Sequence, residues 1–157
     1  MSETSRQGGC RCGELRFSVA GQPILTTGCH CTGCQRMSGG AYSVTSTWPE
    51  EAFELLSGEP VLGGLKGEIR HHHCPNCLSW VYTRAPQIGP FVNVRTTMLD
   101  APPSEPPFLQ CYLSEALPWA RFEAAHSYEK FPAMEEWPTL LEQFAAARTV
   151  VTEETSA

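Results

Sequence analysis

The sequence predicts a mainly β protein, a single domain over residues 1–157, with one helix near its C-terminal end. Short alternations of apolar and polar residues recur along the chain, and this period of two is typical of strands. Gly and Pro, 13 of each, favour many short elements joined by turns. Hydrophobic residues make up 41% of the chain, which is enough to form a core.

The strand-like patterns follow one another from the N-terminus. They lie at 15–19, where Leu15, Phe17 and Val19 alternate with polar residues, and at 42–48, 69–73, 78–83, 91–94 and 108–113. The pair 69–73 and 78–83 flanks a tight turn at Cys74–Cys77. The stretch 101–107 carries four prolines, so we expect a loop there.

One segment has a helical pattern. Pro138 suits the first turn of a helix, and Leu140, Leu141 and Phe144 fall on one face of it. We therefore expect a helix over about 138–149, after a motif-bearing core of about 8–137. Residues 151–157 are expected to be a frayed tail.

Charge and composition exclude several classes of function. A net charge of -6 disfavours binding to nucleic acid or to an anionic membrane surface. The N-terminal residues contain no apolar signal segment, and no apolar run is long enough for a membrane span. We expect a cytoplasmic protein, and a reducing compartment favours metal ligation over disulfides for its cysteines.

Seven of the eight cysteines form three tight groups. They are Cys10 and Cys12, then Cys29, Cys31 and Cys34, then Cys74 and Cys77. Such pairs direct two sulfurs at one point and are half-sites for tetrahedral zinc. Cys10, Cys12, Cys74 and Cys77 would form a closed, structural site. A pairing of the first group with members of the middle group is the alternative.

The middle group, Cys29, Cys31 and Cys34, can surround one ion and leave a fourth position open, as catalytic zinc sites do. Three thiolates suit a soft fourth ligand, so the chemistry favours a thiol substrate held as thiolate. The alternative is that both ions are structural and that His30, the run His71–His73 or Cys111 closes the site. His30 is expected to orient the loop, and Cys111 to be a small buried apolar residue.

Three motifs together resemble a known family. They are GGCRCG at 8–13 followed by LRF at 15–17, CHCTGCQRMSG at 29–39, and CPNC at 74–77. Later landmarks are LDAP at 99–102 and PW at 118–119. In this order and spacing they resemble the glutathione-dependent formaldehyde-activating enzymes, a resemblance shared by centromere protein V.

The resemblance implies a β-tent fold, in which several short antiparallel sheets are stapled by zinc. It implies two Zn²⁺ per chain, a structural ion at Cys10, Cys12, Cys74 and Cys77 and a catalytic ion at Cys29, Cys31 and Cys34. The family activity is a carbon–sulfur lyase reaction run in reverse, which joins glutathione and formaldehyde as S-hydroxymethylglutathione. The partners expected are therefore a small thiol such as glutathione and an aldehyde.

Four residues after the middle group are expected to bind the substrate: Arg36, Ser38, Gly39 and Gly40. The glycines allow close approach of the backbone, and Arg36 has the alternative interpretation of a surface charge.

The sequence departs from the family at Leu78 and Thr97, where glycine is usual, and at Cys111, where many members have His. A rival hypothesis is a non-catalytic zinc module or thiol carrier that binds a metabolite or protein partner. The sequence does not determine the oligomeric state.

Overall fold

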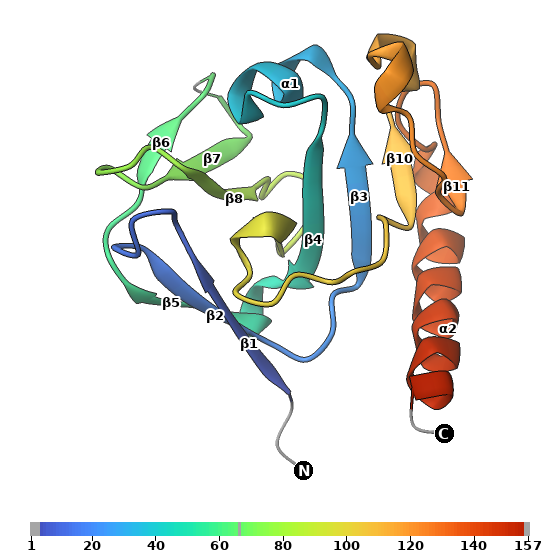
Figure 1. Cartoon of the computed structure of the whole chain (residues 1–157), viewed down its shortest axis with the longest axis horizontal. Helices are drawn as coiled ribbons and strands as arrows, with labels where there is room; N and C mark the ends of the chain where they lie inside the picture. Colours follow the sequence, from blue (N-terminus) through green and yellow to red (C-terminus); the bar gives the residue numbers. More distant parts are fainter. Residues whose placement is uncertain (1–3, 66, 156–157) are drawn as a thin grey trace.

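The computed structural model describes residues 4–65 and 67–155 as two β-sheets with a long helix along one edge (Figure 1). The smaller sheet is antiparallel, in the order β1-β2-β5. Its strands are β1 Ser5–Gly9, β2 Arg16–Ala20 and β5 Phe53–Ser57. Phe17 and Val19 of β2 point into the core, as the alternation of this segment predicts.

The larger sheet has eight strands in the order β11-β10-β3-β4-β9-β8-β7-β6. Its strands are β3 Leu25–Cys29, β4 Ser43–Pro49, β6 Val61–Gly63, β7 Arg70–His73, β8 Trp80–Arg84, β9 Phe91–Arg95, β10 Leu109–Cys111 and β11 His126–Ser127. Neighbours are antiparallel except around β10, which pairs in parallel with both β3 and β11. The mainly β prediction with antiparallel pairing is confirmed, and the parallel pairs at this edge are an addition to it.

Two α-helices accompany the sheets. They are α1 Thr32–Ser38, which follows β3 directly, and α2 Trp137–Thr155, which runs beside β10 and β11 (Figure 1). Single 3-10 turns occur at η1 Glu50–Ala52, η2 Thr96–Met98, η3 Leu113–Glu115, η4 Pro118–Ala120 and η5 Met134–Glu136. None of the helices in the described ranges combines the length and the apolarity needed to cross a bilayer.

The main core lies between the two sheets. Phe17 of the smaller sheet packs in one cluster with Trp48, Tyr82, Val92 and Val94 of the larger sheet. A second cluster joins α2 to the sheet edge through Leu109, Cys111 and Leu140. Burial of these side chains holds the layers together, since each large apolar side chain contributes about 1.5–3 kcal/mol when removed from water.

All six strand-like patterns lie at or around strands, with shifts of one to two residues at the ends. The expected strand at 78–83 begins later, at Trp80, because Leu78 has a left-handed backbone with φ 59°. The loop at 101–107 is confirmed, as this stretch lies outside the strands and helices.

Two helical predictions need correction. A second helix, α1, lies within the middle cysteine motif, where Cys31 caps its first turn and supplies a signal that apolar periodicity does not carry. The C-terminal helix reaches Thr155, so the expected frayed tail is wrong for 151–155. Residues 156–157 of that tail lie outside the described residues.

Candidate metal centres

Two groups of cysteine sulfurs converge in the described structure. Cys10, Cys12, Cys74 and Cys77 form one group, and Cys29, Cys31 and Cys34 form the other. Within each group all the sulfurs lie within 4.8 Å of one another. Chain segments 62 residues apart meet in the first group, where the Cys12 and Cys74 sulfurs are 3.7 Å apart. The structure thus brings together the sets that the spacing of the cysteines predicted.

The four-cysteine group is formed by two tight turns. In the first turn, the Cys10 amide donates to the Leu15 carbonyl at 3.0 Å, and the Leu15 amide donates to the Cys10 sulfur at 3.3 Å. In the second turn, the Leu78 amide donates to the Cys74 carbonyl at 2.9 Å. Cys10 and Cys74 are buried, Cys77 is half-buried and Cys12 is exposed. Thiolates held by backbone amides in this way are the donor set that tetrahedral zinc prefers.

The three-cysteine group is compact because the strand leads directly into a helix. Cys29 ends β3, Cys31 is the N-cap of α1, and Cys34 lies in the first turn of that helix. The Cys34 amide donates to the Cys31 sulfur at 3.3 Å, as an N-cap side chain requires. All three are half-buried. Among the described residues, no fourth His, Cys, Asp or Glu donor joins this group.

The pKa values of the three thiols differ in direction from the ordinary value of cysteine. Hydrogen bonds from Cys29 and Cys34 stabilise a thiolate at Cys31 and hold the pKa of that thiol far below its usual value. Hydrogen bonding to Cys29 and Cys31 raises the pKa of Cys34. Hydrogen bonding to Cys111 and Cys31 raises the pKa of Cys29. A site that already favours one thiolate suits a divalent, thiophilic metal such as zinc, which displaces the remaining protons.

Helix α1 is anchored at its N-terminal end by a distant residue. Glu115 accepts from the Thr32 amide at 3.1 Å and from the Thr32 hydroxyl at 2.9 Å. Gln35 donates to the His30 carbonyl at 2.7 Å and to the Glu115 carbonyl at 3.0 Å. These contacts fix the segment that carries Cys31 and Cys34, and no pattern in the sequence predicts this role of Glu115.

His30 is fully buried and does not belong to the group of metal donors. Its Nε2 is 3.1 Å from the Gln110 side-chain oxygen, and its ring packs on Tyr42 and Phe122. Gln110 uses its amide nitrogen on the Phe122 carbonyl at 2.6 Å, so its oxygen accepts and His30 Nε2 donates. His30 therefore ties the cysteine loop to β10, in line with the orienting role expected of it.

The His71–His73 run also lies outside both groups of donors. His71 Nδ1 is 2.9 Å from the Thr83 hydroxyl, which also accepts from the Trp80 indole at 2.9 Å. The His72 ring stacks on Tyr82, with centroids 4.4 Å apart, and burial lowers the pKa of His72 to about 4. The run is thus engaged in packing and hydrogen bonds within the sheet.

Cys111 lies close to the three-cysteine group without joining it. It is fully buried, it is the register partner of Cys29 in the parallel β3–β10 pair, and its thiol interacts with that of Cys29. The sequence predicted its burial correctly. The contact with Cys29 was not foreseen, because the parallel pairing of β10 is set by tertiary structure.

The expected substrate residues lie at the far end of α1. Arg36 is exposed. It follows Cys34 by two residues, a rotation of about 200° around the helix axis, so it lies on the opposite side of α1 from Cys34. Gly39 has φ 67° and its amide closes the helix on the Gln35 carbonyl. The Gly40 amide donates to the Ser38 hydroxyl at 3.2 Å. Both backbone amides are thus engaged in ending the helix.

Arg95 is a residue of the site that the sequence analysis missed. It is buried on the face of the larger sheet that carries Cys29, and thiolates at Cys34 and Cys29 would raise the pKa of its guanidinium. A basic residue at the end of a short apolar strand gives no sequence signal for such a position.

One cavity lies away from both groups of cysteines. It has a volume of about 790 Å³, is formed by the proline-rich loop, α2 and the larger sheet, and contains no cysteine.

Comparison with known proteins agrees with this description. The family model for the glutathione-dependent formaldehyde-activating enzyme matches residues 5–115. A crystal structure of a Rhodobacter sphaeroides protein superimposes with a TM-score of 0.52 at 15% identity, over 78% of this chain and 98% of that one. At this identity the likeness concerns the fold. None of the curated proteins matches the chain in sequence.

Proposed function

The chain belongs to the family of glutathione-dependent formaldehyde-activating enzymes, and from this premise we propose that it is a zinc-dependent carbon–sulfur lyase-type enzyme. Its reaction would join a small thiol, such as glutathione, to an aldehyde. The observation that carries the proposal is the half-buried group of Cys29, Cys31 and Cys34, with no fourth donor among the described residues. Three protein ligands and an accessible fourth position are typical of catalytic rather than structural zinc.

In this proposal the chain holds two zinc ions with different tasks. Cys10, Cys12, Cys74 and Cys77 would hold a structural ion, since four sulfurs fill its coordination. Cys29, Cys31 and Cys34 would hold the second ion. Bound there, zinc would keep a substrate thiol deprotonated and so in its nucleophilic form.

The reaction balances without an oxidant or a further reactant. The substrate sulfur forms a bond to the aldehyde carbon, the π-electron pair of the carbonyl moves to its oxygen, and the proton lost by the thiol ends on that oxygen. The protein's part is to position the two reactants and to exclude competing bases. Ser38 lies one helical turn after Cys34 on the same face of α1, and Arg36 lies on the opposite face, so both are our candidates only for polar and anionic groups of the thiol that are distant from its sulfur. The turn at Gly39 and Gly40 would leave room for these groups.

The test is turnover by the zinc-loaded protein. Exchange between glutathione, formaldehyde and their adduct, followed by nuclear magnetic resonance, should be faster with the protein than in buffer, and Cys31→Ser should remove the acceleration. Arg36→Ala should raise KM more than it lowers kcat if Arg36 binds an anionic part of the thiol. Equal exchange rates with and without the wild-type protein, over a panel of thiols and aldehydes, would reject the enzyme.

One contact favours the second candidate, a non-catalytic zinc module or thiol carrier. The buried Cys111 thiol interacts with Cys29, so a small movement of β10 would offer a fourth sulfur from the protein itself. In that case wild-type protein would be inert toward thiols and Cys111→Ala would open the site to them.

A further inference from the structure

The pairing of the strands puts Arg95 on the same face of the larger sheet as Cys29. Arg95 of β9 is the register partner of Thr45 on β4. Ser43, two residues before Thr45 and therefore on the same face, is the partner of Cys29 on β3. The opposite face carries the partners Ser46 and Val94, and Val94 belongs to the core between the sheets. The Arg95 side chain thus lies on the face of the larger sheet that also carries Cys29.

Arg95 is a buried cation without a carboxylate partner. It is 8% exposed, and its guanidinium carbon lies 4.0 Å from the centroid of the Trp80 ring. Its side chain makes one hydrogen bond within the described ranges, and that bond is long, 3.4 Å from Nη2 to the Asn93 carbonyl; its Nε has no partner there. The ion pairs of the described residues involve other arginines, Arg16 with Asp100 and Arg84 with Glu50.

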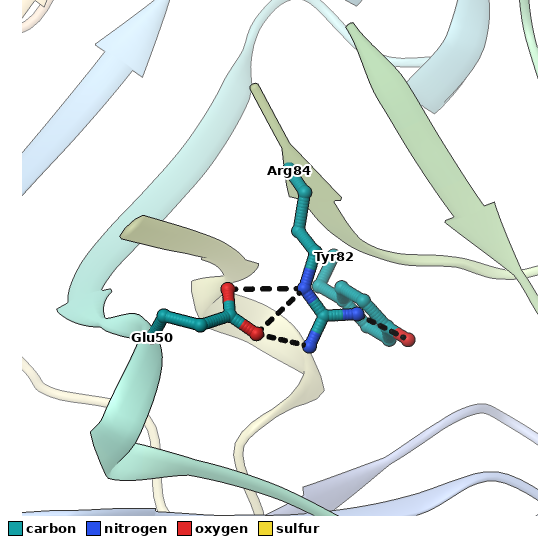
Figure 2. A network of polar contacts seen from close by, with 3 residues as sticks. All are labelled: Glu50, Tyr82 and Arg84. Atoms are coloured by element: carbon teal, nitrogen blue, oxygen red, sulfur yellow. Dashed lines mark hydrogen bonds and ion pairs between the residues drawn. The ribbon is translucent and has the colours of Figure 1, made fainter. Parts of the chain in front are cut away.

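Arg84 shows how this fold neutralises an arginine that it needs to bury. Figure 2 shows its guanidinium held between the Glu50 carboxylate and the Tyr82 hydroxyl. Its Nη2 is 2.6 Å from the Glu50 oxygen. Arg95 is more deeply buried than Arg84 and lacks such a partner, although an uncompensated buried charge is strongly unfavourable.

The negative charge available to Arg95 is that of the cysteines, whose remaining protons a bound metal ion would displace. Burial lowers the pKa of Arg95 to about 10, and the charges of Cys34 and Cys29 act in the opposite direction. Three thiolates and one divalent metal ion would carry a net charge of −1, and a substrate thiolate in the fourth position would make it −2. The cation has no other counter-charge among the described side chains.

We propose that Arg95 is the positioning residue that balances the charge of a metal–trithiolate centre at Cys29, Cys31 and Cys34 and so selects an anionic fourth ligand. The inference rests on the proposed function for the identity of that ligand, a thiolate. Its electrostatic part concerns the retention of the metal and can be measured without any thiol.

The first measurement uses the cobalt-substituted full chain, in which sulfur-to-cobalt charge-transfer absorption increases with each sulfur bound. Arg95→Met keeps an unbranched apolar stem and removes the guanidinium with its charge. We expect it to raise the dissociation constant for glutathione at least about tenfold, since a charge pair at the dielectric constant typical of buried sites contributes that much. Imidazole, a neutral ligand, should bind with unchanged or higher affinity.

The second measurement is the release of metal to a chelator in the absence of thiol. Arg95→Met should speed release from the three-cysteine site and leave the four-cysteine site unchanged, which provides a control within the same molecule. Arg95→Lys should retain most of the wild-type behaviour in both measurements. Arg84→Met serves as the matched control, because Arg84 also stacks on aromatic rings but is paired with Glu50.

The outcomes separate this inference from the proposed function. If the wild-type cobalt protein does not respond to glutathione, the proposed function fails, and metal release still decides the role of Arg95. If Arg95→Met binds glutathione as wild type does, or releases both ions at wild-type rates, the inference is overturned. Equal loss of glutathione and imidazole binding would show that Arg95 acts through packing alone, which also overturns it.

Discussion

At the scale of single residues, the backbone of Leu78 is the clearest departure from what the sequence would favour. It follows the second cysteine turn with φ 59°, and its side chain is 69% exposed. A left-handed conformation costs a residue with a Cβ atom roughly 1–2 kcal/mol, and glycine avoids that cost. The turn nevertheless forms, because the Leu78 amide bonds to the Cys74 carbonyl and two cysteines converge with a second pair.

We expect Leu78→Gly to stabilise the protein. Glycine removes the free-energy cost of the left-handed backbone in the folded state, and this gain exceeds the cost of the greater conformational entropy of glycine in the unfolded chain. The free energy of unfolding should therefore rise by about 0.5–1 kcal/mol. Denaturant unfolding of the zinc-loaded protein would measure it. Leu65→Gly is the control, because Leu65 is 90% exposed and does not have positive φ. That variant should be slightly less stable than wild type, and a loss of stability in Leu78→Gly would refute the account of strain.

At the scale of elements, the short helix α1 depends on contacts beyond itself. It has seven residues, and an isolated helix of this length is not stable in water. Its first turn is held by the Cys31 cap and by Glu115, which lies in η3 directly after β10. The position of two candidate ligands is therefore set by a residue more than eighty positions away.

Removal of this anchor should affect the three-cysteine site more than the fold. Glu115→Ala leaves the Thr32 amide to water, so we expect a loss of about 1 kcal/mol in stability, as for the loss of a helix cap. Metal should also leave Cys29, Cys31 and Cys34 faster than in wild type, which chelator competition would measure. Glu123→Ala, at another exposed glutamate, should change neither quantity. Wild-type release rates in Glu115→Ala would mean that α1 is positioned by the metal alone.

At the scale of the whole molecule, the four-cysteine group joins the two sheets. Cys10 and Cys12 follow β1 of the smaller sheet, while Cys74 and Cys77 form the turn between β7 and β8 of the larger one. The apolar core connects the same layers, so a metal ion at this position would act as a second link between them. The three-cysteine group connects only β3 and the helix that follows it, which are already adjacent in the chain.

The two groups should therefore respond differently to the same change. Cys74→Ser removes the link between the sheets and should lower the melting temperature strongly, because structural zinc sites carry about 10 kcal/mol or more of apparent binding free energy. Cys31→Ser should leave the fold largely intact. Thermal melts of both variants, with metal analysis, would test this.

Graded chelation of the wild-type protein provides the control, since the ion of the three-cysteine site should leave first. Equal destabilisation by the two variants, or loss of both ions together with the fold, would contradict the division into a structural and a catalytic ion.

The sequence by itself determined the features that depend on local spacing. Alternation of apolar residues located strands such as β2 and β4, because a strand with one buried face requires a period of two. Paired cysteines with short spacers located the two groups of sulfurs, because such turns direct neighbouring side chains at one point. Strands such as β1 Ser5–Gly9 and β3 Leu25–Cys29 were not predicted, because neither segment has a clear alternation of apolar and polar residues. They form strands through backbone pairing with β2 and β4, which do have that alternation.

Only the tertiary structure decided what surrounds the three-cysteine group. Glu115, Cys111 and Arg95 come from η3, β10 and β9. The order and register of strands distant in sequence put Glu115 at the start of α1, Cys111 beside Cys29, and Arg95 on the sheet face that carries Cys29. No local pattern encodes a parallel pairing of β10 with β3 or the face on which Arg95 emerges. The physical reason is that spacing within a segment fixes which side chains of that segment converge, whereas their electrostatic and steric surroundings depend on which other segments pack against them.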